Sequence, residues 1–263
     1  MKKEPIDYTE NQLKDYLVED TKKGKLVWLY KKYYVIKSNL IKDNKNIRVY
    51  DYIAKRLLGL DDNLENYFIK NIKEIEREPR TQDKGKVYIP INHNLKIEKE
   101  KAIVMKKALS QNKQLDEEVL AKTLLEEEFN FIGKIINYQI PINEEDEDGA
   151  GKIDLLAYNK EYFKDKRIIS LIEFKKESNT ETILRAILEI CTYYCQINKE
   201  VLVREYTKLP LSKVEVWKVI LIYKGSKQHK DFINSENIRT LVRRLNVKIF
   251  LLDNNNNITP LAL

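Results

Sequence analysis

The stretch that decides the fold is Ile168-Ile-Ser-Leu-Ile-Glu173-Phe174-Lys175, an apolar run that ends in two side chains of opposite charge. Its β-branched and apolar composition predicts a buried strand over 167–175. Because successive side chains of a strand point to opposite faces, Glu173 and Lys175 share one face, roughly 7 Å apart, and Phe174 points to the other. Charged groups inside an apolar strand are costly unless they are paired or bind a metal ion, so this strand end is a candidate functional site.

A further charged residue interrupts the strand that is predicted just before this one. In Gly151-Lys-Ile-Asp154-Leu-Leu, the carboxylate of Asp154 stands in an otherwise apolar run over 152–158. Neighbouring strands lie about 4.8 Å apart, so Asp154 and Glu173 could converge on one divalent cation, with Lys175 beside it. An ordinary ion pair between Asp154 and Lys175 is the simpler alternative. The Gly-x-Ile-Asp spelling together with Glu-x-Lys at a strand end favours the cation site.

The segments around these two strands predict an α/β domain. Helical spacing marks two long segments and one short one, at 116–128, 182–196 and 238–245. Apolar and β-branched runs predict strands at 135–142, 152–158, 167–175, 216–223 and 247–252. This order is typical of a mixed sheet flanked by helices. We expect the polar run 254–257 to be a surface loop.

The N-terminal part of the chain is predicted to form a separate module. The same criteria predict helices at 9–17, 47–58, 64–78 and 96–112, with extended segments at 26–36 and 86–92. A polar patch near 110–114 is the expected boundary between a mainly helical α+β module over 1–112 and a domain over 113–263. The module contains no recognisable motif. We expect it to serve recognition, regulation, homodimer formation or binding of a protein partner.

Composition excludes several classes of function. The 263 residues include 48 Lys and Arg against 41 Asp and Glu, and the net charge of +7 is compatible with a nucleic-acid ligand. Only His93 and His229 are histidines, which argues against zinc hydrolases and Ser/His triads. Neither phosphate-loop nor dinucleotide-binding glycine patterns occur. Two cysteines, Cys191 and Cys195, and no long apolar run predict a cytoplasmic protein outside the membrane.

At its charged strand ends the sequence resembles the PD-(D/E)XK nuclease superfamily. The segment from Gly151 to Leu156 matches the G-x-h-D-h-h hairpin of that superfamily, where h is apolar. Ile172-Glu173-Phe174-Lys175 matches its h-(D/E)-h-K strand. The resemblance covers the C-terminal half and is closest to NucS-like and RecB-like domains. It implies a restriction-endonuclease-like core, which is a mixed four-stranded sheet flanked by helices.

Two helical positions extend the resemblance. Many members have Gln-x-x-x-Tyr on the helix after the Lys, and this chain has Glu189-Ile-Cys-Thr-Tyr193, with Glu in place of Gln. Several branches have Glu-x-x-Leu-x-x-x-Leu on the first helix, which the segment starting at Glu117 matches. Glu118 and Glu128 remain alternatives for that role.

The resemblance implies a nuclease that hydrolyses phosphodiester bonds with Mg²⁺ or Mn²⁺. Asp154, Glu173 and the Phe174 backbone carbonyl would hold the metal, and Lys175 would orient water or stabilise charge on the phosphate. Glu117 would bind a second metal or anchor the first. We expect a DNA endonuclease rather than a ribonuclease, for example in restriction or phage defence. A non-catalytic or effector-gated nucleic-acid-binding subunit on the same fold is the alternative.

Overall fold

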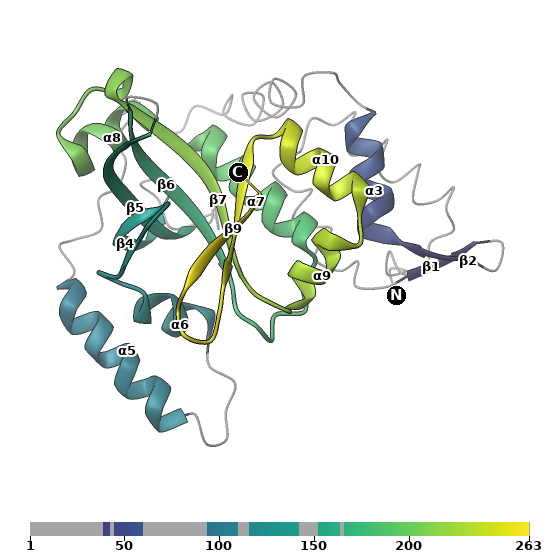
Figure 1. Cartoon of the computed structure of the whole chain (residues 1–263), viewed down its shortest axis with the longest axis horizontal. Coiled ribbons are helices and arrows are strands. Elements are labelled where there is room, and N and C mark those ends of the chain that lie inside the picture. Colours follow the sequence, from purple (N-terminus) through teal and green to yellow (C-terminus); the bar gives the residue numbers. More distant parts are fainter. Residues whose placement is uncertain are drawn as a thin grey trace, which may run out of the picture. The chain divides into compact units, whose positions relative to one another are not determined.

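The computed structural model describes residues 39–42, 45–59, 94–109, 116–141, 152–163 and 166–262 (Figure 1). Packing divides the chain into two compact units, each built from three segments. The first consists of Met1–Arg80, Glu177–Cys195 and Gly225–Val247, and the second of Thr81–Lys176, Gln196–Lys224 and Lys248–Leu263. The predicted elements at 9–17, 26–36, 64–78 and 86–92, and the predicted boundary after residue 112, lie outside the described residues.

A seven-stranded sheet dominates the second unit in the described part of the chain. Its strands lie side by side in chain order: β3 (Glu128–Phe129), β4 (Gly133–Pro141), β5 (Lys152–Phe163), β6 (Lys166–Lys175), β7 (Val214–Tyr223), β8 (Val247–Leu252) and β9 (Ile258–Ala262). β6 and β7 are parallel, whereas β3/β4, β4/β5, β5/β6 and β8/β9 are antiparallel. The α/β class with helices flanking a sheet is therefore confirmed.

The prediction of a four-stranded sheet is wrong, because three further strands extend it. β8 joins beyond β7, and the short strands β3 and β9 add to the two edges. Pro260 is tolerated in β9 because an edge strand has unpaired N–H positions. The polar run 254–257 forms the turn between β8 and β9, where the Asp253 carboxylate accepts hydrogen bonds from the backbone N–H groups of Asn255 and Asn257.

A large hydrophobic cluster of the second unit lies on one face of this sheet. Alternation places Leu155, Ile172 and Phe174 on the same face, all fully buried. Helices α5 (Leu95–Leu109) and α6 (Glu117–Thr123) belong to this unit, as does α8 (Lys199–Thr207), which was not predicted, and the short 3₁₀ turn Leu211–Lys213. The hydrophobic cluster on this face also includes Ala121 of α6, together with Leu124 and Leu125, which directly follow that helix.

The predicted helix over 116–128 ends at Thr123, earlier than its periodicity indicates. Backbone hydrogen bonds to β4 replace further helical bonds: Glu126 N–H donates to the Ile135 carbonyl, and Ile135 N–H donates to the Glu127 carbonyl. Glu126 takes a left-handed conformation with φ of 64°, which turns the chain out of the helix. Tertiary pairing therefore overrides the local helical pattern.

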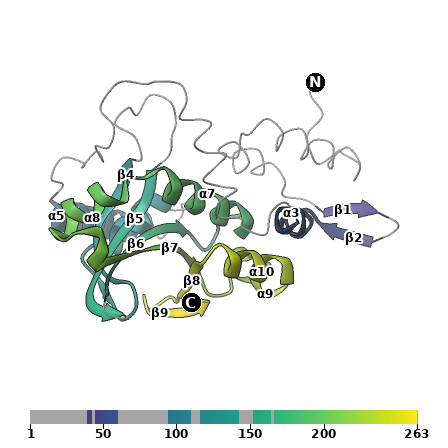
Figure 2. The same ribbon diagram turned by 90° about the horizontal axis from the view of Figure 1, so that it is seen from above.

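The first unit is mainly helical in its described part. It contains the hairpin β1 (Asn39–Lys42) and β2 (Lys45–Arg48), and the helices α3 (Val49–Leu58), α7 (Ile183–Gln196), α9 (Lys227–Ile233) and α10 (Glu236–Arg244). α3 packs beside α10 in both views (Figures 1 and 2), and Asp51 accepts hydrogen bonds from Ser235 and Asn237 at the start of α10. α9 was not predicted. None of the described helices is both long and apolar enough to cross a membrane.

Candidate functional site

The two acidic candidates lie at the end of one strand pair. β5 and β6 pair Leu155 with Ile172 as the last pair of their ladder, and the next residues along the two strands are Asp154 and Glu173. Continued by one step, this register puts the two residues on the same face of the sheet. The structure thus brings together the two carboxylates that the sequence placed on neighbouring strands.

Asp154 is held by donors from both neighbouring strands. Its Oδ2 accepts a hydrogen bond of 2.9 Å from the backbone N–H of Phe174 in β6. Its Oδ1 accepts one of 3.2 Å from the side-chain amide of Gln139 in β4. Because the N–H and C=O of a strand residue point to the same edge, the Phe174 carbonyl faces the β5 side together with Asp154. Two carboxylates and one backbone carbonyl therefore lie around the end of the β5–β6 ladder.

Glu173 and Lys175 form a buried ion pair. Lys175 Nζ lies 2.6 Å from Glu173 Oε1, and the two side chains are 6% and 3% exposed. Alternation along β6 puts both on the face opposite the Phe174 ring, as the sequence predicted. Interactions between charges this far from water are much stronger than at the surface. The lysine is thus a strongly held positive charge beside the acidic pair.

Glu117 reaches the same strand end from α6. Its Oε1 accepts a hydrogen bond of 2.7 Å from the backbone N–H of Lys176, directly after β6. The two alternatives lie elsewhere: Glu118 pairs with Lys122 at 2.8 Å, and Glu128 is exposed on β3. Of the three glutamates, Glu117 alone is placed by a contact recorded at this strand end.

The Glu-x-x-x-Tyr pair lies on α7 in the first unit. Tyr193 donates a hydrogen bond of 3.0 Å from its hydroxyl to Glu189 Oε1, one helical turn away. Arg185 Nε lies 3.7 Å from the other oxygen of the same carboxylate. These contacts explain how a carboxylate and a phenol are accommodated on one buried helix face.

Gln139 is the site residue that the sequence reasoning missed. It lies in β4, a strand that was predicted, and it contacts the Asp154 carboxylate directly. The available signal was the polar pair at alternate positions of an otherwise apolar strand, Asn137 and Gln139. Asn137 is likewise engaged, because its amide donates to the Tyr206 hydroxyl at 2.7 Å. Desolvation by burial raises the pKa of Tyr206 above its ordinary value.

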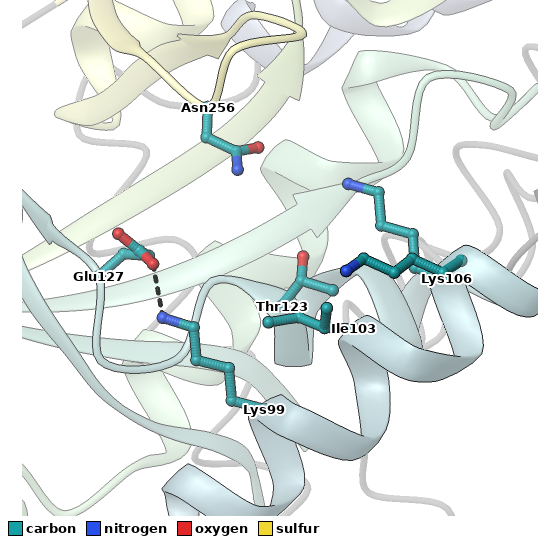
Figure 3. A pocket seen from close by; sticks show the side chains of 7 residues that line it. Lys99, Ile103, Lys106, Thr123, Glu127 and Asn256 are labelled. Atoms are coloured by element: carbon teal, nitrogen blue, oxygen red, sulfur yellow. Dashed lines mark hydrogen bonds and ion pairs between the residues drawn. The ribbon is translucent and has the colours of Figure 1, made fainter.

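A basic pocket of about 430 Å³ lies in the second unit between α5, the end of α6 and the β8–β9 turn (Figure 3). Its lining residues are Lys99, Ile103, Lys106, Lys107, Thr123, Glu127 and Asn256. Figure 3 shows Lys99 bound to Glu127 on one side and Asn256 projecting from the turn. Three lysines against one glutamate give the lining a formal charge of +2, which suits an anionic ligand.

The ion pairs next to this pocket favour the charged forms of their members. Hydrogen bonds and charge interactions with Lys101, and then with Lys122, lower the pKa of Glu98. Burial acts against the charged form of Lys122, but its pairing with Glu118 and Glu98 outweighs that effect and raises its pKa. The surface between α5 and α6 is therefore charged over the whole physiological pH range.

Among the described residues, no three His, Cys, Asp or Glu side chains come close enough together to form a metal-binding group. No family model matches the chain, and no curated protein or solved structure is significantly similar to it. The fold and the site therefore define an α/β protein with a buried acidic and basic cluster at a strand end. The resemblance to the nuclease superfamily rests on the motif residues alone.

Proposed function

We propose that the chain is a metal-dependent nuclease of the PD-(D/E)XK type that hydrolyses phosphodiester bonds. The observation that carries this proposal is that the β5–β6 ladder ends at Leu155 and Ile172, directly before Asp154 and Glu173, and that Asp154 binds the backbone N–H next to Glu173. The backbone N–H of Phe174 binds the first carboxylate and Lys175 binds the second. The motif spelling and the strand geometry thus support the same set of residues.

Asp154, Glu173 and the Phe174 carbonyl are the groups that would hold a divalent cation. All three supply oxygen, which Mg²⁺ and Mn²⁺ prefer, and Mg²⁺ commonly binds through only one or two carboxylates. The hydrogen bonds from Gln139 and the Phe174 N–H fix the orientation of the Asp154 carboxylate. The donor set therefore fits the cation. When bound, the cation would supply a nucleophilic water at neutral pH and neutralise charge on the phosphate.

Lys175 is the residue suited to stabilise charge on the reacting phosphate. Its ammonium has three protons, and one of them faces Glu173 Oε1. A fixed positive charge in a site with little water stabilises developing negative charge without reorganising. Glu117 would fix the strand end by binding the Lys176 N–H, which keeps the chain after Lys175 in place.

DNA is the expected substrate, and the charge distribution supports a nucleic-acid backbone. The net charge is +7, and the pocket at α5 offers Lys106 and Lys107 together with the amide of Asn256. Lysines on a groove wall bind phosphates without reading sequence. An endonuclease acting in restriction or phage defence, within the cytoplasm, is consistent with these features.

The contact between Glu173 and Lys175 favours an effector-gated form of the same enzyme as a second candidate. At 2.6 Å the ammonium engages a carboxylate oxygen that a cation would also use. A partner or effector that shifts Lys175 toward the substrate would release this oxygen. A non-catalytic binding subunit on the same fold would, by contrast, bind nucleic acid equally well in EDTA.

The test is cleavage of labelled single-stranded DNA, double-stranded DNA and RNA with Mg²⁺, Mn²⁺ or EDTA. Wild-type protein is compared with Asp154→Asn and with Glu118→Gln, an exposed carboxylate outside the cluster. We expect cleavage that needs the metal, is abolished in Asp154→Asn and persists in Glu118→Gln. Cleavage that survives in Asp154→Asn would overturn the assignment. Binding that is unaffected by EDTA, without cleavage under any condition, would favour the binding subunit.

A further inference from the structure

Gln139 lies in one row with the two carboxylates. β4 and β5 pair Tyr138 with Leu155 and Ile140 with Ile153, which places Gln139 opposite Asp154. On the other side, Asp154 directly precedes the last β5–β6 pair, Leu155 with Ile172, and Glu173 directly follows it. β4, β5 and β6 are adjacent strands of the sheet (Figure 1), and Asp154 belongs to the middle one.

The backbone of Gln139 has an unfavourable conformation for a residue with a side chain. Its φ is +48°, in the left-handed region that non-glycine residues rarely adopt and that does not belong to a regular strand. A register irregularity between Ile135 and Asn137 lies just before it in the same strand. Such conformations persist only where the surroundings impose them, and they cluster at functional sites.

The hydrogen bonds show what this conformation achieves. Gln139 Nε2 donates to Asp154 Oδ1 at 3.2 Å, while the Phe174 N–H donates to Oδ2 at 2.9 Å. One donor from each neighbouring strand thus fixes each oxygen, so the carboxylate cannot rotate without losing a bond. Second partners of this kind orient the groups that ligate a metal.

We propose that Gln139 is a positioning residue that holds the Asp154 carboxylate ready for a divalent cation. This inference rests on the proposed function and deepens it. Gln139 touches neither substrate nor cation and acts only through Asp154. Its strained backbone is maintained because the amide must reach Oδ1 from that point of β4.

Calorimetric titration of the full-length protein with MnCl₂, in the absence of nucleic acid, tests the inference. Gln139→Leu keeps the bulk and removes the donor, and Gln139→Gly removes both the donor and the backbone strain. We expect both variants to bind Mn²⁺ at least about tenfold more weakly than wild type. We also expect Gln139→Gly to unfold about 2–4 °C higher than Gln139→Leu, because glycine adopts positive φ freely.

Asn246→Gly is the matched control, since Asn246 has an almost identical φ of +49° in the turn before β8. It should unfold at a higher temperature with unchanged Mn²⁺ affinity. Equal Mn²⁺ affinity in wild type and Gln139→Gly would overturn the role of Gln139 and leave the nuclease proposal standing. Weaker binding in the Gln139 variants, together with no cleavage by wild type, would support the positioning role and overturn a nuclease that is active without an effector. Wild type that binds no Mn²⁺ would overturn both.

Discussion

Replacing Lys175 by Met removes the ammonium that lies 2.6 Å from Glu173 while keeping a side chain of similar length. Glu173 then remains buried without the positive charge that it pairs with in the wild-type protein. Removing one partner of a buried ion pair costs about 3–5 kcal/mol, because the other charge is left uncompensated. We therefore expect Lys175→Met to lose stability by about this amount.

A loss of about 3 kcal/mol lowers the melting temperature by at least about 6 °C in a protein of this size. Thermal unfolding followed by circular dichroism in EDTA measures this directly. Glu173→Gln should be less destabilising, because the glutamine side chain keeps an oxygen that can accept a hydrogen bond from the Lys175 ammonium. Lys175→Met should therefore be the weaker protein of the two when metal is absent.

Mg²⁺ provides the decisive comparison. A divalent cation neutralises both carboxylates, so Mg²⁺ at about 100 times its dissociation constant, which stabilises by about 2.7 kcal/mol, should restore most of the stability of Lys175→Met. The restoration should disappear when Asp154→Asn is added. A Mg²⁺ effect on Lys175→Met no larger than on wild type would refute the reasoning, as would a larger loss in Glu173→Gln.

Three further changes test other parts of the structure. Gly133→Ala should lower the free energy of unfolding in urea by about 2 kcal/mol or more, because φ at this position is +81° and a Cβ would lie 2.3 Å from a carbonyl oxygen of β5. Gly225→Ala, at φ of +85° but with open space around it, should cost only about 1 kcal/mol. Equal losses in the two variants would contradict the close approach of β5 to Gly133. Burial raises the pKa of Tyr206, so the stability that its neutral hydroxyl contributes is fully present below about pH 10 and is lost as pH rises through the folded pKa. The stability of Tyr206→Phe should therefore fall less steeply between about pH 9 and 11 than that of wild type. An unchanged slope would contradict the raised pKa. Lys106→Glu should weaken DNA binding and reduce the salt dependence of binding by about one phosphate contact. Lys213→Glu, which changes an exposed lysine outside the pocket, should leave both quantities unchanged. Equal effects of the two changes would show that the pocket does not contact DNA.

The central strands could be predicted because their signals are local. The run before Glu173 and the single aspartate in the preceding hairpin define two strands, and alternation alone places their charged side chains on one face. The shared face of Glu173 and Lys175 follows from alternation, but their ion pair was not predicted, because the sequence offered Asp154 as the simpler partner of Lys175.

The remaining features depend on contacts between distant segments. The helix that starts at Glu117 ends at Thr123 because Glu126 and Glu127 form backbone hydrogen bonds with β4 instead of continuing the helix. The periodicity of the sequence does not predict this pairing. The edge strands β3 and β9 are too short to be recognised without their partners. Gln139 could be noted as a polar residue in a strand, but neither its positive φ nor its bond to Asp154 can be read from spacing.

Single-turnover cleavage by wild type, Asp154→Asn, Lys175→Met and the double variant tests the central claim most directly. Residues that act as one catalytic unit are not additive. We predict that each single change lowers the Mg²⁺-dependent rate at least about a hundredfold and that the double variant is no slower than the worse single one. A rate that is unchanged by Asp154→Asn, in protein that remains folded, would contradict the account.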